Sequence, residues 1–397
     1  MEPTSAFVLY NRCTMNRISL LLLFASITVG WAADVDERAS YEDRAAIIVS
    51  NDKIELTVLP LGGPLASIVL RDDAEKLNPL WDSFRNDRET GRPVRMTGGV
   101  GHFTCVDGFG PVSDEESAAG SQGHGEAHRL YWSTVSAKAS GGEAKLVQTV
   151  QLPRLHETFT REISLRDGEN VLLVRSSLKS LLSFDRPAVW AEHATIGSPF
   201  LERGVTVVDM SANRAKTRPR ENGSSRLRLA SDVEFEWPMA PTKAGGKMDM
   251  RAPVKSGDQL DHTGHLMTPG GKHAWVTALH PEKGLLIGYV FPTADFPWLQ
   301  TWQHYPEEGL MARGLEFGTQ AFDLPRRTVI EENKIFGQLL YRWLPAMSEI
   351  KASYLMFWTR VPDGFEGVSD VRLDGGKLMI RDDRSGKSME LPTAQTL

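Results

Sequence analysis

The chain has 397 residues, of which 41% are hydrophobic and 24% are charged, a composition typical of a soluble globular protein. Its net charge is −6 and it contains no long basic run, which argues against a nucleic-acid-binding surface. The length would suffice for two domains, but all-β sandwiches also run well past the average domain length as one unit.

The N-terminal segment has the pattern of a secretory signal peptide. Arg17 precedes the mostly apolar run 18–29, and small residues follow around Ala32. The run is shorter than the roughly 20 residues that a membrane span needs. We therefore predict a signal peptide over residues 1–32, with Met15 as an alternative start. Cleavage after Ala32 would leave no membrane span, and we expect a secreted or periplasmic protein.

The two cysteines differ in their expected fate. Cys13 lies in the predicted signal peptide, so Cys105 would be the only cysteine of the mature chain. No disulfide within the chain is then available. The apolar neighbours of Cys105 favour a structural role, with a nucleophilic thiol as the alternative.

From Arg44 onward, short runs of aliphatic and β-branched residues alternate with turn residues, a pattern typical of strands. The expected strands include residues 45–49, 54–59, 65–70, 130–137, 144–152, 159–165, 171–178, 205–209, 274–279, 285–290 and 351–361. Hairpin turns are expected at residues 166–170 and 281–284. Only residues 330–340 have a helical pattern, so we predict an all-β sandwich or barrel.

The remaining segments set the expected domain limits. We predict one large sandwich domain over residues 45–362, with surface loops at 213–225 and 240–261. Residues 363–397 are more polar and are expected to form a C-terminal extension with a hairpin of 377–380 against 388–391.

Glu316 is the first candidate for chemistry. It lies between the apolar residues Leu315 and Phe317, which Gly314 and Gly318 flank in turn. A carboxylate partly withdrawn from water binds its proton more tightly, which moves its pKa toward the range useful for base catalysis near neutral pH. The alternative is a surface glutamate on an edge strand.

Two histidines are the next candidates. His124 lies between two glycines, which let the backbone approach a ligand closely. His124 and His128 also have the spacing of a metal-binding pair, but that spacing acts from a helix, which the glycines disfavour. His193 lies at the end of an expected strand, and its near-neutral pKa suits a proton donor to a glutamate base. Satisfied polar side chains without a role are the alternative for these histidines.

Aromatic and amide side chains precede Glu316. Trp302 and Gln303 belong to a cluster in which aromatic rings alternate with hydrogen-bonding groups. Rings stack on the CH faces of sugars while polar groups bind the hydroxyls, so both residues are candidate substrate contacts; a core position is the alternative. Asp261, which begins an expected strand, is a further candidate.

Several of these short motifs occur together in a recognisable order. They are His124-Gly125, residues 192–197 (EHATIG), Asp261-His262, Gly314-Leu315-Glu316 with Gln320, and residues 343–346 (WLPA). In this order, over about residues 48–361, the chain resembles the aldose 1-epimerase (galactose mutarotase-like) superfamily and is similar to its divergent members.

The resemblance implies a fold and a reaction. The fold would be a single, mostly antiparallel β-supersandwich with a concave sugar-binding sheet. Glu316 would be the base on the anomeric hydroxyl and His193 the acid at the ring oxygen, with His124 and Asp261 binding sugar oxygens. The reaction would need no metal, nucleotide or other cofactor and no covalent intermediate.

The chain departs from the family pattern in two places. No counterpart of the family's Asn-Arg pair precedes His124, where residues 98–110 lie instead, and residues 114–121 form an unusual insertion. The predicted function is an aldose 1-epimerase-like isomerase acting on a carbohydrate partner. The alternatives are a non-catalytic carbohydrate-binding protein, or a polysaccharide hydrolase or lyase. A hydrolase usually needs a second carboxylate, for which Glu126, Glu192 and Asp261 are the candidates.

Overall fold

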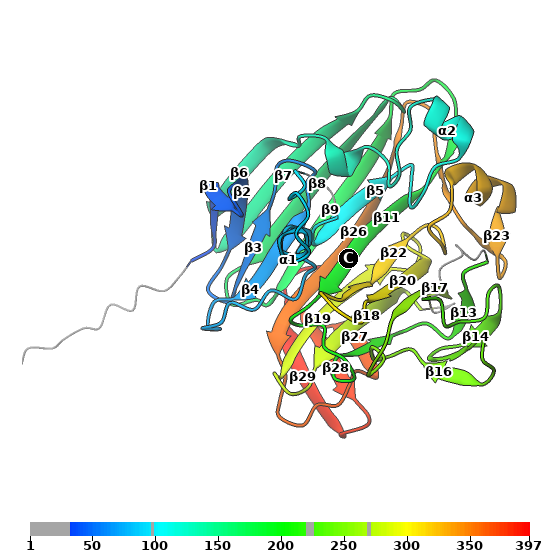
Figure 1. The fold of residues 1–397 in the computed structure, drawn as a ribbon. Helices are drawn as coiled ribbons and strands as arrows, with labels where there is room; N and C mark the ends of the chain where they lie inside the picture. The colour runs from blue at the N-terminus through cyan, green and yellow to red at the C-terminus, as the bar shows by residue number, and fades with distance from the viewer. Residues whose placement is uncertain (1–31, 97–98, 220–225, 268–270) are drawn as a thin grey trace, which may run out of the picture. The chain divides into compact units, whose positions relative to one another are not determined.

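The structure, a computed structural model, describes residues 32–96, 99–219, 226–267 and 271–397 (Figure 1). The predicted signal peptide lies outside the described residues, apart from Ala32. The described chain consists mainly of antiparallel strands in two large sheets, with short helices in the connections.

The larger sheet has twelve strands within the described residues, and its strand pairs are antiparallel. In spatial order they are β1 (Asp34–Tyr41), β2 (Arg44–Ser50), β3 (Ile54–Val58), β4 (Leu65–Leu70), β5 (His102–Val106), β11 (Trp190–Gly197), β21 (Ala312–Gly314), β20 (Trp298–Tyr305), β17 (Gln259–Leu266), β13 (Arg214–Thr217) and β14 (Glu234–Glu236), with β22 (Glu316–Gly318) pairing with β11 and β20. β1 lies ahead of the expected domain start, and its largely exposed, polar sequence explains why the hydrophobic pattern did not indicate it.

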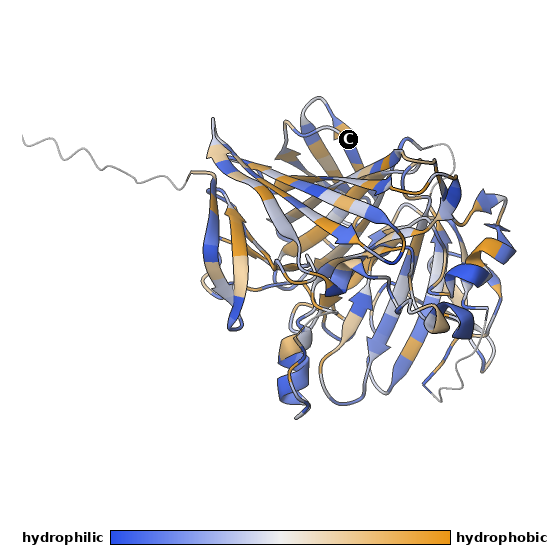
Figure 2. Cartoon of the chain, turned by 90° about the horizontal axis from the view of Figure 1, so that it is seen from above, coloured by the Kyte–Doolittle hydropathy of each residue, from blue (hydrophilic) through white to orange (hydrophobic). Residues whose placement is uncertain are grey.

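The second sheet has eight strands in the described part of the chain. In spatial order they are β12 (Val207–Met210), β18 (His273–His280), β19 (Leu285–Pro292), β26 (Glu349–Arg360), β9 (Val171–Ser180), β8 (Glu157–Arg166), β7 (Glu143–Leu152) and β6 (Ser133–Ser140). The strand expected at residues 130–137 is displaced toward the C-terminus and begins at Ser133. Along β7 buried residues alternate with partly exposed ones, and Figure 2 shows such alternation as changes of colour along the strands.

The main core lies between these two sheets, because its buried residues come from strands of both. Trp190 of β11 packs edge-on against Phe159 of β8, with ring centroids 5.1 Å apart. Phe317 of β22 stacks on Phe291 of β19, with centroids 4.4 Å apart. These rings anchor β11 and β22, so the residues that alternate with them face away from the core. The predicted all-β sandwich is confirmed.

The helices are short and only one lies near the predicted position. They are α1 (Ser83–Glu89), α2 (Asp114–Ala118), the 3₁₀ helix η1 (Ala127–Arg129) and α3 (Arg326–Glu332). The helix expected over residues 330–340 is wrong in its extent. Asn333 ends α3 with a left-handed φ of 63°, and Gly337, at φ 83°, forms the turn between β23 (Lys334–Ile335) and β24 (Gln338–Leu339). None of the described helices is long and apolar enough to cross a membrane.

The two expected surface loops contain strands. The first holds β13, and the second holds β15 (Met239–Pro241), β16 (Lys247–Asp249) and the start of β17; residues 220–225 of the first lie outside the described residues. Ala215, Ala240 and Met250 are buried together in a small core. These isolated apolar residues are too few for a periodic signal, which is why the sequence predicted loops.

The C-terminal residues form a third layer on the second sheet. β27 (Asp370–Asp374), β28 (Lys377–Asp382) and β29 (Lys387–Pro392) make an antiparallel sheet, in which Leu378 lies opposite Leu391. Its apolar side chains join a core with Trp275 and Phe357. The expected hairpin of residues 377–380 against 388–391 is present as β28 and β29. The segment is not a polar extension, however, because it shares a core with the sandwich. A further small pair, β10 (Arg186–Ala188) and β25 (Arg342–Leu344), joins two connecting segments.

Candidate functional site

Two neighbouring strands of the larger sheet carry the predicted acid and base. β11 pairs with β5 so that His193 lies opposite Phe103, and it pairs with β22 so that Ala191 lies opposite Gly318. Paired residues, and residues two apart along a strand, share one face of a sheet. His193 and Glu316 therefore project from the same face, the one turned away from the main core.

The carboxylate of Glu316 is fully enclosed. Its Oε2 accepts a hydrogen bond from Nε2 of Gln300 at 2.8 Å, and its Oε1 lies 3.3 Å from Nε2 of His193. Burial raises the pKa of Glu316 well above its ordinary value; the hydrogen bond from Gln300 lowers this pKa and the charge of Asp323 raises it. The net effect favours the protonated carboxyl.

A glycine and a fixed amide orient this carboxylate. A Cβ on Gly314 would lie 2.2 Å from Oε1 of Glu316, so the carboxylate occupies space that a side chain at residue 314 would fill. The Oε1 of Gln300 accepts the backbone N–H of Asp323 at 2.6 Å, which directs its Nε2 toward Glu316. Gln300 thus holds one oxygen of Glu316 and leaves the other beside His193.

The imidazole of His193 is held on two sides. Its ring stacks on Phe103 with centroids 4.2 Å apart, and its Nδ1 lies 3.0 Å from Oγ1 of Thr195. Burial lowers the pKa of His193 well below its ordinary value. A neutral imidazole beside a protonated Glu316 makes a pair that holds one transferable proton.

His124 presents a donor next to this pair. It lies in the connection between α2 and η1 at a left-handed φ of 63°, and its Nδ1 accepts the backbone N–H of Gly110 at 3.2 Å. A ring nitrogen that accepts a hydrogen bond carries no proton, so the neutral tautomer has its proton on Nε2. Burial lowers the pKa of His124, and its ring centroid lies 5.2 Å from that of His193. The flanking Gly125 serves a close approach to the carbonyl of Val106 rather than to a ligand.

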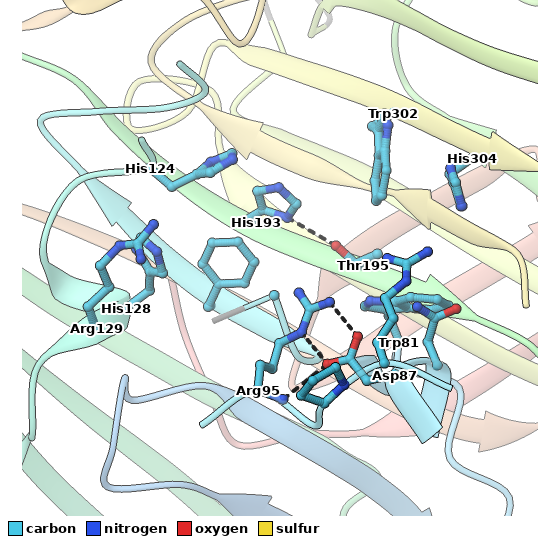
Figure 3. Close-up of a pocket in the computed structure, with 15 residues that line it drawn as sticks. Trp81, Asp87, Arg95, His124, His128, Arg129, His193, Thr195, Trp302 and His304 are labelled. Atoms are coloured by element: carbon cyan, nitrogen blue, oxygen red, sulfur yellow. Dashed lines mark hydrogen bonds and ion pairs between the residues drawn. The ribbon is translucent and has the colours of Figure 1, made fainter. Parts of the chain in front are cut away.

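A cavity of about 770 Å³ opens beside His193 (Figure 3). The rings in its wall are those of Trp81, Phe103, His124, His128, His193, Trp302 and His304. Trp302 and His304 stack with centroids 5.5 Å apart, and in Figure 3 both stand across the cavity from His128. Glu316 is not part of the wall, so the proton-sharing pair meets the cavity through His193.

Two of the predicted contacts lie on the other face of the sheet. Asp261 and Gln303 are cross-strand partners, and Nε2 of Gln259 donates to Asp261 at 2.9 Å and to Gln303 at 3.0 Å. Asp261 also accepts the backbone N–H of Leu229 at 3.1 Å. The structure therefore brings together Glu316, His193, His124 and Trp302, and it places Asp261 and Gln303 in structural contacts. Strand alternation is the reason, since neighbours in a strand point in opposite directions.

The other candidate carboxylates also lie elsewhere. Glu192 faces the main core, where its Oε2 lies 3.0 Å from Nε2 of His102 and accepts the hydroxyl of Thr104 at 3.1 Å. Glu126 accepts the backbone N–H of Arg154 at 3.0 Å. None of the three candidates for a second catalytic carboxylate is therefore beside Glu316.

Sequence reasoning missed Gln300, which contacts Glu316, and Arg218, whose Nε lies 3.1 Å from Oδ1 of Asp323. His262, which the sequence had offered only as part of the Asp261-His262 motif, has its Nε2 3.8 Å from Oδ2 of the same Asp323 carboxylate. Strand alternation could have indicated Gln300, because this residue lies two positions before Trp302 and its side chain therefore lies on the same face of the sheet.

The chain is similar in fold to several solved structures, although its sequence identity to them is low. No protein-family model and no curated protein matches the chain. A Klebsiella pneumoniae structure assigned as an aldose 1-epimerase matches with a TM-score of 0.60 at 14% identity, over 82% of this chain and 83% of that one. A galactose mutarotase-like protein from Clostridium acetobutylicum matches with a TM-score of 0.54 at 13% identity, over 83% of this chain and 99% of that one. A galactose mutarotase related enzyme from Lactobacillus acidophilus matches with a TM-score of 0.53 at 12% identity, over 80% and 98%.

Proposed function

We propose that this chain, which has the galactose mutarotase-like β fold, is an isomerase that interconverts the α and β anomers of a sugar. The observation that carries the proposal is the contact of Glu316 with His193, beside the neutral donor His124 and a cavity with aromatic walls. Anomer exchange requires one proton to be removed and one to be delivered, which such a pair supplies.

In the proposed reaction the sugar enters from the cavity past His193 and separates it from the enclosed carboxyl of Glu316. The one proton of the pair first passes from the Glu316 carboxyl to the His193 imidazole, which leaves a carboxylate and an imidazolium. The Glu316 carboxylate takes the proton of the anomeric hydroxyl while the His193 imidazolium gives a proton to the ring oxygen. The bond between the anomeric carbon and the ring oxygen breaks as the carbonyl forms. Rotation about the adjacent carbon–carbon bond and reclosure by the reverse transfers give the other anomer.

The buried setting of the pair supports this direction of transfer. After ring opening Glu316 is protonated and His193 is neutral, which is the state that burial favours. A positioned acid and a positioned base each contribute about 10²–10⁴-fold to such reactions. In this scheme Nε2–H of His124 donates to a sugar oxygen and Trp302 stacks on the CH face of the ring.

The test is anomer exchange measured by saturation-transfer NMR on the purified protein with a panel of monosaccharides. Acceleration that increases in proportion to protein concentration and disappears on unfolding is the expected result. Ligand binding without acceleration would leave a carbohydrate-binding protein. New reducing ends from a polysaccharide panel would instead favour hydrolysis.

Anomer exchange is expected to stay constant as the pH falls through 6.5, the ordinary pKa of histidine. The pair works while it holds one transferable proton. Above the raised pKa of Glu316 it loses that proton and has no acid; below the lowered pKa of His193 it gains a second and has no base. Exchange rates from about pH 4 to 9, corrected for the spontaneous reaction, measure this profile. An inflection near 6.5 would show that His193 titrates as an exposed histidine.

A further inference from the structure

The cavity beside His193 has an excess of positive charge, although the chain as a whole has a net charge of −6. Three arginines line it, namely Arg92, Arg95 and Arg129, against the single carboxylate of Asp87. Arg95 and Asp87 neutralise each other through two hydrogen bonds of 2.7 Å, which Figure 3 draws as dashed lines. The unbalanced charge of the wall is therefore that of Arg92 and Arg129.

These two guanidinium groups are exposed, and within the described residues neither makes a side-chain hydrogen bond or ion pair. Arg129 ends η1 and lies next to His128 in Figure 3. Burial lowers the pKa of His124 and that of His128, the latter to about 3, and the charge of Arg129 acts in the same direction on both. Burial, the charge of Arg226 and, to a smaller extent, the charge of Arg92 lower the pKa of His304 to about 4. The histidines thus stay neutral, and the arginines are the groups in the wall that can attract an anion.

Guanidinium groups bind carboxylates and phosphates through paired, charge-assisted hydrogen bonds, which neutral sugars cannot make. We propose that the sugar bound in this cavity carries an anionic group, a carboxylate or a phosphate. Arg129, on the His124 side, and Arg92, on the Trp302 side, both attract this group into the cavity. This inference rests on the proposed function only in taking the ligand to be a sugar.

The test compares the affinities of D-glucuronate, D-glucose 6-phosphate and D-glucose, measured by NMR titration of the wild-type protein at low and high salt. At least one acidic sugar is expected to bind about tenfold more tightly than glucose, and less so at high salt. A preference for glucuronate identifies a carboxylate, and a preference for the phosphate identifies a phosphoryl group. Equal affinity for all three sugars would overturn the inference.

Arginine variants test which side chains cause the preference for acidic sugars. Arg129→Gln and Arg92→Gln are each expected to reduce it severalfold, and the double variant is expected to abolish it. Arg38→Gln, at an exposed position on β1 outside the cavity, is the matched control and should leave it unchanged. A preference that survives in the folded double variant would contradict the assignment.

The readout separates this inference from the proposed reaction. Selective binding of acidic sugars without anomer exchange would retain the inference and remove the isomerase. Anomer exchange of sugars, with equal binding of acidic and neutral ones, would retain the isomerase and remove the inference.

Discussion

Replacing Glu316 with glutamine is expected to slow anomer exchange by a factor of about 10²–10⁴ without changing the fold. The amide has nearly the same shape and can still accept the hydrogen bond from Gln300, but it cannot take a proton from the anomeric hydroxyl. Saturation-transfer NMR measures the loss, and the affinity for the sugar is expected to change much less. Such a pattern identifies an interaction made in the transition state.

Glu192→Gln is the matched control for this variant. Glu192 is also buried on the same part of the sheet, but it faces the main core and contacts His102 and Thr104. The control is expected to cost stability, because an amide cannot accept from all of its present donors, and to retain exchange while it is folded. Equal losses of activity in the two variants would show that Glu316 acts through the fold rather than as the base.

Arg186→Met is expected to lower the free energy of unfolding by about 3–5 kcal/mol. The guanidinium of Arg186 pairs with both Asp107 and Glu157, whose side chains are fully enclosed. Without this cation, Glu157 loses its ion-pair partner, and the ion pair left to Asp107 among the described residues is that with Arg326, 3.5 Å away. Urea denaturation followed by tryptophan fluorescence measures the change.

Arg327→Met provides the comparison for an exposed ion pair. The side chain of Arg327 is 56% exposed and pairs with Glu331 one helical turn away and with Glu115 of α2, so its removal is expected to lower the stability far less than removal of Arg186. If Arg186→Met were as mild as this variant, the buried carboxylates would have to be protonated or reached by water in the folded protein.

The sequence predicted the strands with a strong apolar pattern and the residues whose positions follow from them. Glu316 and His193 meet because each lies between residues that pack into the core, and that packing determines which face carries them. The same alternation shows why Asp261 and Gln303 were misplaced. They were chosen by residue type. Since Trp302 and Gln303 are neighbours on β20, their side chains lie on opposite faces of the sheet, so only one of them can face the cavity.

Other features depend on contacts that one sequence does not reveal. Gln300 has its role because a backbone N–H of Asp323 fixes its amide, and these residues are distant in sequence. The helix was predicted to continue past Glu332 because the hydrophobic pattern does not show that Asn333 and Gly337 have a left-handed backbone. Polar composition likewise hid the few apolar residues that attach the C-terminal segment.

That attachment has a consequence for synthesis of the protein. Trp275 and Phe357 lie on the face of the eight-stranded sheet that β27–β29 cover. While the nascent chain is still on the ribosome, that face stays uncovered until β27–β29 emerge, and exposed apolar surface of this kind is prone to aggregation. A recombinant fragment ending at Pro362 would keep the residues of the candidate site and yet leave this apolar surface permanently exposed.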